Sequence, residues 1–427
     1  MIVPSVDLRG GNAVQLVGGK ELAVDAGDPV PIADRFGLVG EVAVIDLDAA
    51  MGTGSNNEVV LDLVRRVRCR VGGGIRDAKS AIRLLDAGAH RVILGTAATP
   101  DVLRELPRNR VIAALDARNG EVVDEGWTRA TGRRVEDRIA ELREYVGGFL
   151  VTFVEQEGGL GGWNEKQLER ITRMVELAGP ARLTVAGGVK TPADIAAVDR
   201  LGADAQVGMA LYTGAFGLAE GFCAPLTSDR SDRFWPTIVT DPGGRALGLV
   251  YSNLESVRAS IERGRGVYFS RSRGDLWAKG ETSGNVQELL GISVDCDRDS
   301  LRFTVRQHGA FCHTGSATCF GESRGFASLD ATLAERVQSP PVGSYTARLL
   351  DDPSLLRAKL LEEAVELSDA ESPGDVAHEA ADVAYFALVA ARARGASLED
   401  VERELDRRTR RVTRRPGNAK VSAGSDA

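Results

Sequence analysis

Cysteine and histidine are scarce in this chain: its 427 residues include 5 cysteines and 4 histidines. So small and odd a number of cysteines does not suggest a disulfide framework, and it favours a reducing cytoplasm as the location. No apolar run approaches the roughly 18 residues that a membrane-spanning helix needs. The first residues, MIVPSVDLRGG, lack the long apolar core of a signal peptide and predict a strand instead.

Positive charge is not in excess either. Lysine and arginine (53) are fewer than aspartate and glutamate (61), and the net charge of −8 argues against binding to nucleic acid or to an anionic membrane. Hydrophobic residues make up 43% and charged residues 27%, the balance of a globular protein with buried cores. The length favours two or three domains.

The scarce metal-binding residues are gathered in one stretch. Residues 295–320, DCDRDSLRFTVRQHGAFCHTGSATCF, hold three of the five cysteines, two of the four histidines and three aspartates at every second position. Any function inferred for this chain has to account for that stretch.

Residues 1–222 alternate between short β-branched runs and helical patterns. VAVIDLDA (42–49) and VIAALDA (111–117) predict strands, and AKSAIRLLDAG (78–88) predicts a helix. This alternation is typical of a parallel α/β fold.

An internal repeat narrows the expected fold to a (β/α)8 TIM barrel. VGGGIRD (71–77) is echoed by VAGGVKT (185–191), and each glycine pair precedes a second strand that ends in glycine. Such glycines let backbone N–H groups approach a phosphate, which predicts a ligand with a phosphate at each end; glycines that only form tight turns are the alternative. The predicted substrate-binding residues are Gly73, Gly74, Gly95, Thr96, Gly187, Gly188 and Gly208.

Two aspartates stand where catalysis in a barrel is expected. Asp7 ends the first predicted strand, and Asp116 ends the strand that opens the second half. Carboxylates on opposite sides of a barrel mouth can act as acid and base on one substrate, whereas a buried capping role is the alternative for each.

The barrel segment resembles the ketol isomerases of histidine biosynthesis. The resemblance is carried by the strings VDLRGG, VIDLDAAMGTGSNN, VGGGIRD, ILGTA, ALDARNG, EGW and VAGGV. It covers residues 1–222 and implies an aldose-to-ketose rearrangement of the doubly phosphorylated aminoimidazole carboxamide ribotide ProFAR. It also implies that Asp7 and Asp116 form the acid–base pair and that Thr152 assists them.

The same segment departs from that family's pattern near the expected ligand. Gln15 stands where the family has an arginine, Gln156 stands where it has a cation, and Glu157 replaces a shorter aspartate. Two cations are thus missing from a site for a dianionic ligand. An active isomerase and a barrel retained as an inactive scaffold are the two alternatives.

A small α+β region is expected over residues 230–323, after a linker at 223–234 that no strand or helix period crosses. WPTIVTD and ALGLVYS predict a strand pair around the turn sequence DPGGR. NLESVRASIERG predicts a helix that ends at Gly264.

Two sets of metal ligands interleave in this region. If DCDRD is a strand, its period of two places the carboxylates of Asp295, Asp297 and Asp299 on one face, where hard oxygen ligands suit Mg²⁺. The thiolates suit Zn²⁺, and three protein ligands leave a fourth position for water, as in catalytic zinc sites. The thiolate set is Cys296, Cys312 and Cys319.

Two alternatives to catalytic zinc remain at this point. A structural zinc would take His313 as its fourth ligand, and buried cysteines would bind no metal at all.

The strings YFSRSRGDLWAKGETSGN, DCDRD, CHTG and TCF closely resemble the phosphoribosyl-AMP cyclohydrolases over residues 235–321. The resemblance implies hydrolytic opening of an adenine ring, zinc held by the three cysteines of two subunits, Mg²⁺ held by the three aspartates, and His313 as a proton carrier. Arg271, Arg273, Lys279 and Glu281 are the predicted substrate contacts, with a solvated charged hairpin as the alternative.

The pattern becomes all-helical over residues 326–420, with helices predicted at 355–370 and 376–395 and a third one after Ser397. Acidic residues repeat at spacings of three and four on the first two helices, where a Mg²⁺ ion would offset their repulsion; a solvated acidic face is the alternative. These residues are Glu362, Glu363, Glu366, Glu379 and Asp382.

EExxE followed by ExxD resembles the α-helical phosphoribosyl-ATP pyrophosphohydrolases, as do LLRAKLLEEAVEL, EAADVAYFAL and VTRRPGNAK. This implies Mg²⁺-dependent release of pyrophosphate. The three families that the chain resembles catalyse consecutive steps of one pathway, so the implied ligands are phosphoribosyl-ATP, phosphoribosyl-AMP and ProFAR. Zinc ligands shared between two subunits imply a homodimer. The rival reading is a binding protein with a purely structural zinc.

Overall fold

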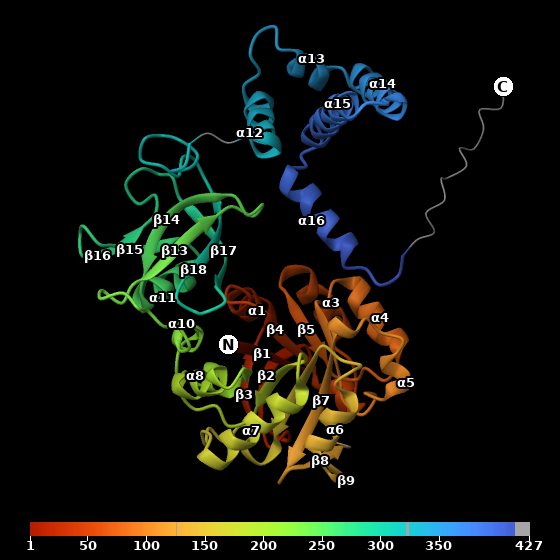
Figure 1. The fold of residues 1–427 in the computed structure, drawn as a ribbon, viewed down its shortest axis with the longest axis vertical. Coiled ribbons are helices and arrows are strands. Elements are labelled where there is room, and N and C mark those ends of the chain that lie inside the picture. Colours follow the sequence, from red (N-terminus) through yellow and green to blue (C-terminus); the bar gives the residue numbers. More distant parts are fainter. Residues whose placement is uncertain (125, 322–323, 415–427) are drawn as a thin grey trace, which may run out of the picture.

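The computed structural model describes residues 1–124, 126–321 and 324–414, so the last residues of the predicted segments 230–323 and 326–420 lie outside the description. Three regions follow one another along the chain (Figure 1). We refer to residues 1–223 as the barrel, to residues 235–321 as the middle region and to residues 324–414 as the C-terminal region.

Eight parallel strands close into a barrel, which confirms the fold predicted for the first half of the chain. The strand order is β10-β11-β12-β1-β4-β5-β6-β7, and parallel pairing of β7 with β10 closes the ring. The strands are β1 (Ile2–Arg9), β4 (Val42–Asp46), β5 (Cys69–Gly72), β6 (Arg91–Leu94), β7 (Val111–Arg118), β10 (Gly148–Phe153), β11 (Arg182–Ala186) and β12 (Ala203–Val207).

Helices cover the outside of the barrel because each turns one apolar stripe towards the strands. In α4, Ala78, Ala81 and Leu85 are buried at helical spacing, and the side chain of Asp77 caps the N-terminus. The barrel helices are α1 (Pro29–Gly37), α2 (Leu47–Met51), α3 (Asn57–Arg66), α4 (Ala78–Ala87), α5 (Pro100–Leu103), α6 (Val135–Leu142), α7 (Glu165–Ala178), α8 (Pro192–Arg200), α9 (Met209–Tyr212) and α10 (Leu218–Cys223).

Two antiparallel extensions continue from barrel strands. β2 (Asn12–Val17) pairs with β1 and leads to β3 (Glu21–Gly27), while β8 (Glu121–Asp124) pairs with β7 and leads to β9 (Arg129–Arg134). The first extension places Gln15 beside the end of β1.

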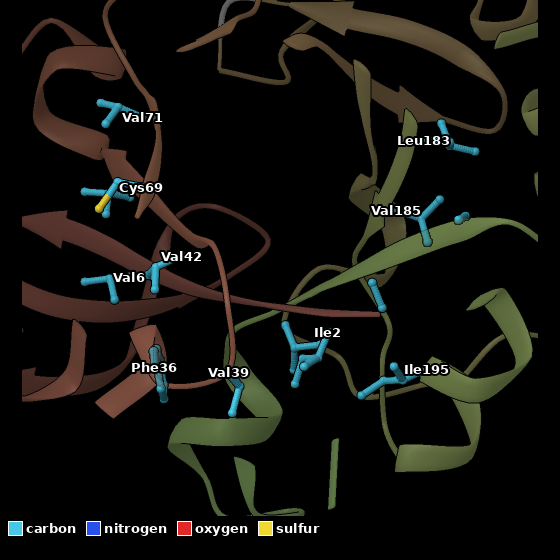
Figure 2. Packing of buried hydrophobic residues seen from close by; sticks show 14 of the residues in the cluster. Ile2, Val6, Phe36, Val39, Val42, Cys69, Val71, Leu183, Val185 and Ile195 are labelled. Carbon is cyan, nitrogen blue, oxygen red and sulfur yellow. The ribbon is translucent and has the colours of Figure 1, made fainter. Parts of the chain in front are cut away.

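The two cysteines outside the 295–320 stretch belong to the apolar core. Cys69 lies on β5 near Val71 of the same strand and Val42 of the adjacent strand β4 (Figure 2), and Cys223 is buried at the end of α10. The barrel interior is filled by a smaller cluster that includes Ile93, Ile112 and Leu150. These packed interiors leave the strand ends as the place for chemistry.

The middle region is a four-stranded sheet with one helix and one separate hairpin. The sheet order is β14-β13-β18-β17, and the predicted strand pair and the predicted helix ending at Gly264 are confirmed. The elements are β13 (Trp235–Thr240), β14 (Ala246–Ser252), α11 (Leu254–Arg263), β15 (Val267–Ser270), β16 (Asp275–Ala278), β17 (Gln287–Val294) and β18 (Leu301–Gln307).

The stretch DCDRD is not a strand, so the conditional prediction of a two-residue period there is wrong. β17 ends at Val294, and residues 295–299 form the loop that turns the chain back into β18. Arg298 has a backbone φ of 67°, a left-handed conformation that extended strands do not contain. We call residues 295–299 the acidic loop.

The C-terminal region is helical, as predicted, and it has an apolar cluster of its own around Leu356, Phe386 and Val389. α14 and α15 pack along each other, and Ser397 and Asp400 form the predicted capping box of α16. The helices are α12 (Gly325–Gln338), α13 (Tyr345–Asp351), α14 (Pro353–Asp369), α15 (Pro373–Arg392) and α16 (Leu398–Thr409). None of the described helices has the combination of length and apolar character that crossing a bilayer requires.

The three regions contact one another. One apolar cluster continues from the barrel into the middle region, where it includes Phe303, and the N–H of Ile292 donates to the carbonyl of Leu38. α16 runs from the C-terminal helices down to the barrel (Figure 1), and Asp86 of the barrel accepts from the N–H of Val412 beyond its end.

Candidate active sites

The predicted acid–base residue Asp7 lies at the C-terminal end of β1, in the barrel mouth. The hydroxyl of Ser5 donates to its Oδ1 at 2.7 Å, and the side chain of Gln15 donates to its Oδ2 at 3.2 Å. Burial raises the pKa of Asp7 to about 6, although both hydrogen bonds oppose the rise. A carboxyl with this pKa can hold or release a proton near neutral pH.

The second predicted carboxyl, Asp116, lies at the end of β7 and is bonded differently. Its side chain accepts from Thr152 on the paired strand β10 and from Trp127, and burial raises its pKa. Thr152 itself is buried. The structure thus joins Asp116 to Thr152, and the assisting role of Thr152 in catalysis stays a prediction.

Glu157, after β10, adds a third carboxyl to the same mouth. Burial, together with the charges of Asp7 and Asp116, raises the pKa of Glu157 to about 8. Its Oε2 and Oε1 of Gln206 are buried atoms without a hydrogen-bond partner among the described residues. Both side chains line one cavity together with Asp7. Polar atoms of this kind are free to accept from a ligand.

The glycine pairs serve close packing as well as any ligand. A Cβ on Gly73 would lie 2.1 Å from the carbonyl oxygen of Asp46, and one on Gly187 would lie 2.5 Å from that of Phe153. All four paired glycines have a positive φ. Tight turns therefore account for the pairs without a ligand, so their phosphate contacts remain a prediction.

The two halves of the barrel differ at the cavity. Its lining includes Gly187, Gly188 and Gly208 of the second half. From the first half, Gly95 and Thr96 are exposed, and a Cβ on Gly95 would meet no described atom within 4 Å. The second half therefore offers the more enclosed of the two predicted phosphate positions.

Replacing Glu157 by Gln is expected to flatten the dependence of stability on pH. The folded protein holds a proton on Glu157 up to about pH 8, whereas an ordinary glutamate releases it near 4.5. Between these two pH values the folded state binds more protons than the unfolded state. The free energy of unfolding therefore falls as pH rises, by at most about 1.4 kcal/mol per pH unit. Thermal unfolding followed by circular dichroism should show a shallower fall for Glu157→Gln. The exposed neighbour variant Glu155→Gln should keep the original slope; equal slopes in both variants would contradict the assignment.

The acidic loop brings its three carboxylates together although it is not a strand. Oxygen atoms of Asp295, Asp297 and Asp299 lie within 4.8 Å of one another. Asp295 Oδ1 also accepts from the N–H groups of Asp299 and Ser300, at 3.1 and 3.2 Å, so the loop folds around that carboxylate. The convergence predicted from the sequence is thus present, for a different backbone reason.

Two of the three predicted zinc ligands lie side by side. Cys312 and Cys319 interact through their side chains, and the hydroxyl of Thr314 donates to the sulfur of Cys312 at 3.1 Å. The bond from Thr314 is the main reason why the pKa of Cys312 falls to about 6. A thiol with this pKa is a thiolate, the form that binds metal, at neutral pH.

Cys296, on the acidic loop, is exposed and stands apart from that pair. Its sulfur lies 3.9 Å from Asp297 Oδ1, and among the described residues it joins neither group of three close metal-binding side chains. His313 is exposed as well, with Nδ1 3.8 Å from the sulfur of Cys312. One chain therefore assembles two of the three thiols.

The predicted substrate contacts of the middle region divide in two. Lys279 is 8% exposed, and its ammonium donates to the carbonyl of Phe311 at 2.6 Å, so a solvated hairpin does not describe it. The other three, Arg271, Arg273 and Glu281, are exposed. The guanidinium of Arg271 lies 3.8 Å from the ring centre of Tyr251.

In the C-terminal region, three of the predicted carboxylates converge between α14 and α15. Oxygens of Glu363, Glu379 and Asp382 lie within 4.8 Å of one another, and Glu363 is 5% exposed. Lys359 Nζ lies 2.7 Å from Glu363 and 3.0 Å from Glu362. The ammonium offsets part of the negative charge at this site.

The two remaining predicted ligands lie outside that group of three. Glu362 is half-exposed on α14. Glu366 is exposed. Partial desolvation by its neighbours, together with the charges of Glu363 and Glu379, raises its pKa. Helical spacing alone had placed all five together.

Sequence reasoning missed several residues that orient these sites. Ser5 precedes Asp7 by two residues, and the period of a strand could have found it. Lys359 precedes Glu363 by four residues, which helical spacing could have found. Trp127 reaches Asp116 from the β8–β9 extension, and no local signal predicts that contact.

Comparison with known proteins divides the chain in the same order. A family described as histidine biosynthesis protein matches residues 1–217, phosphoribosyl-AMP cyclohydrolase matches residues 248–321, and phosphoribosyl-ATP pyrophosphohydrolase matches residues 326–409. The three matches together cover each of the sites described above.

Individual relatives agree with this division. An imidazole-4-carboxamide isomerase of Haloarcula marismortui is 40% identical over 234 residues, which is 51% of this chain and 93% of the relative. A histidine biosynthesis trifunctional protein of Komagataella pastoris is 40% identical over 315 residues, which is 73% of this chain and 37% of the relative. Its counterpart in Neurospora crassa is 53% identical over 193 residues, 45% of this chain and 22% of the relative. The chain thus spans well under two thirds of the fungal relatives.

Proposed function

The chain belongs to the histidine biosynthesis protein family, and from that premise we propose that it catalyses consecutive steps of histidine biosynthesis. The C-terminal region releases pyrophosphate from phosphoribosyl-ATP, the middle region opens the adenine ring of phosphoribosyl-AMP, and the barrel isomerises the product, ProFAR. The observation that carries the proposal is the sequence of three family matches, each over a region whose acidic or thiol side chains converge.

The carboxylates between α14 and α15 fit Mg²⁺. Their oxygens are hard ligands, and Glu363 is too buried to be satisfied by water alone. Mg²⁺ held by Glu363, Glu379 and Asp382 supplies charge neutralisation and an activated water for a triphosphate. Lys359, paired with Glu363, orients that carboxylate.

The thiols of the middle region fit Zn²⁺. Cys312 and Cys319 lie together, and Thr314 favours the thiolate form of Cys312. The exposure of Cys296 supports a zinc site that Cys296 of a second copy of the chain completes, in a homodimer. Zn²⁺ held there supplies a Lewis acid for hydrolysis of a purine ring. Free thiolates of this kind fit a reducing cytoplasm.

The chain's own residues divide the remaining work of that step. His313, exposed next to Cys312, moves the proton between water and the ring. Lys279 fixes the carbonyl of Phe311, directly before Cys312, and so holds the thiol segment in place. The carboxylates of the acidic loop would hold Mg²⁺, which would supply positive charge for a phosphorylated substrate.

In the barrel, Asp7 and Asp116 act as the acid–base pair. An aldose-to-ketose rearrangement needs one group that protonates the sugar ring oxygen, so that the ring opens at C1, and one that removes the proton from C2, while C1 gains a proton and C2 becomes the ketone carbon. Both aspartates have a raised pKa, and Thr152 orients Asp116. The unpaired atoms of Glu157 and Gln206 are placed to accept hydrogen bonds from the ligand.

The proposal is tested by supplying the purified chain with phosphoribosyl-ATP, Mg²⁺ and Zn²⁺. Pyrophosphate, ring-opened ProFAR and its ketose isomer should appear in that order, followed by chromatography and absorbance. The first product that fails to appear removes the step of its region, and the later steps are then tested with phosphoribosyl-AMP or ProFAR supplied directly. ProFAR supplied alone and recovered unchanged would establish the barrel as a scaffold.

For the barrel step, Asp7→Asn is expected to slow ketose formation from ProFAR by about a hundredfold or more, the usual contribution of a general acid or base. The amide keeps the hydrogen bonds to Ser5 and Gln15 within reach but cannot exchange a proton. Pyrophosphate release should be unchanged. Asp101→Asn, on the exposed α5, is the matched control. Ketose formation at the original rate in Asp7→Asn would exclude this role.

A further inference from the structure

The side chain of Arg298 reaches out of the acidic loop to the barrel. Its guanidinium makes a two-point ion pair with Asp199 of α8: Nη2 lies 2.7 Å from Oδ1, and Nε donates to Oδ2. Arg298 stands between Asp297 and Asp299 in the chain. The pair therefore ties the loop that carries the three carboxylates to a different region of the protein.

This ion pair is largely shielded from water. The side chain of Asp199 is 6% exposed and that of Arg298 is 21% exposed. The amino group of Met1 lies 2.6 Å from Asp199 Oδ1 and approaches from the barrel side. A two-point pair with so little exposure holds its geometry more firmly than the average surface ion pair.

The backbone of Arg298 is held as well as its side chain. Its φ of 67° lies in the left-handed region, which residues other than glycine seldom adopt. Its carbonyl accepts from the N–H of Thr227, in the segment that leads out of the barrel, at 2.9 Å. An unfavourable backbone conformation persists only where its surroundings enforce it, and here the barrel side supplies both contacts.

The acidic loop needs such a support from outside. Three carboxylates within 4.8 Å repel one another when no cation lies between them. The backbone hydrogen bonds that oppose this repulsion run from the N–H groups of Asp299 and of Ser300, directly after the loop, to Asp295. Arg298, which lies between two of these aspartates, is a cation, but its guanidinium pairs with Asp199 of the barrel and not with the three aspartates.

We propose that Asp199 and Arg298 form a latch by which the barrel positions the acidic loop to bind Mg²⁺. Asp199 and Arg298 are positioning residues in this scheme, and the ligands are Asp295, Asp297 and Asp299. The proposal rests on the proposed function of the acidic loop in the middle region. It gives the barrel a task in the ring-opening step that is separate from isomerisation.

The latch is tested in the full-length chain with two single variants. Asp199→Asn removes the charge on the barrel side, and Arg298→Asn removes it on the loop side while keeping a residue type that tolerates a left-handed backbone. The matched control is Glu220→Gln. Glu220 of α10 pairs with Arg258 of α11, so it joins the same two regions through side chains that do not belong to the acidic loop.

Two measurements separate positioning from general stability. Hydrogen exchange of residues 295–300 should become about tenfold faster in both variants. The Mg²⁺ concentration that gives half-maximal ring opening should rise about tenfold, while the rate at saturating Mg²⁺ stays near that of the original chain. Glu220→Gln should change neither quantity. The double variant should be no worse than either single variant, because both remove one interaction.

Each other result overturns the latch. Equal effects in Glu220→Gln would mean that the ion pair only joins the regions, and additive effects in the double variant would mean that the two residues act separately. If Asp199→Asn disturbs the barrel through Met1, Arg298→Asn still decides the question from the loop side. Should the original chain fail to open the adenine ring, the proposed function fails, while unchanged hydrogen exchange in the variants would be the failure of the latch itself.

Discussion

Cys312→Ser should abolish opening of the adenine ring and leave pyrophosphate release intact. The hydroxyl of Thr314 donates a hydrogen bond to the sulfur of Cys312 and lowers the pKa of this thiol, so the thiolate form is favoured. A serine hydroxyl stays protonated at neutral pH and is a poor zinc ligand. Loss of the Lewis acid costs several kcal/mol, so the ring-opening rate should fall by about a thousandfold or more.

Two quantities are measured on Cys312→Ser: its zinc content by atomic spectroscopy, and its rate of ring opening by absorbance with phosphoribosyl-AMP as substrate. Cys223→Ala is the matched control, since this thiol is buried at the end of α10 in the barrel and is not one of the proposed zinc ligands. The control should keep its zinc and its rate. Cys312→Ser with full zinc and full ring opening would exclude the proposed zinc site.

Glu363→Gln should have an effect of similar size on the other hydrolytic step. Glu363 is buried between α14 and α15 and shares one oxygen cluster with Glu379 and Asp382. An amide there cannot supply the negative oxygen that Mg²⁺ needs, and the rate of pyrophosphate release should fall by about a thousandfold. Ring opening of phosphoribosyl-AMP by the same protein should be unaffected.

The neighbouring residue provides the control for that variant. Glu362 precedes Glu363, carries the same side chain and contacts the same Lys359, yet it is half-exposed and stands outside the cluster. Glu362→Gln should therefore change pyrophosphate release by no more than about threefold, as removal of an exposed ion pair does. Equal losses in the two variants would contradict the assignment of the metal to Glu363.

The barrel was predictable because its signal is local and repeated. Each glycine pair has a positive φ and a close backbone neighbour, which only glycine allows, so the pattern at Gly73 returns at Gly187. The capping box at Ser397 was predictable for the same reason, since its partner stands three residues away. The strand–helix alternation that predicted a parallel barrel consists of such local signals.

The parts that escaped prediction depend on contacts between distant residues. The acidic loop has the alternating pattern of a strand, but the left-handed backbone of Arg298 and its pair with Asp199, 99 positions away, decide its shape. Glu363 and Glu362 have the same local pattern, and only the packing of α15 distinguishes them. The raised pKa of Glu157 likewise arises from burial and from the charges of Asp7 and Asp116, which lie on strands far from it in the sequence.

α16 has a consequence for how intermediates travel. Near its start, Glu399 pairs with Arg306 of the middle region at 2.6 Å, and beyond its end Asp86 of the barrel accepts from Val412. The middle region is itself fixed to the barrel through Asp199. Each of the three regions thus contacts the other two. Such mutual contacts oppose hinge motion between regions more than a linear arrangement of domains would. We therefore expect the separations between the three sites to change little, and an intermediate of the proposed pathway would then cross between them by diffusion.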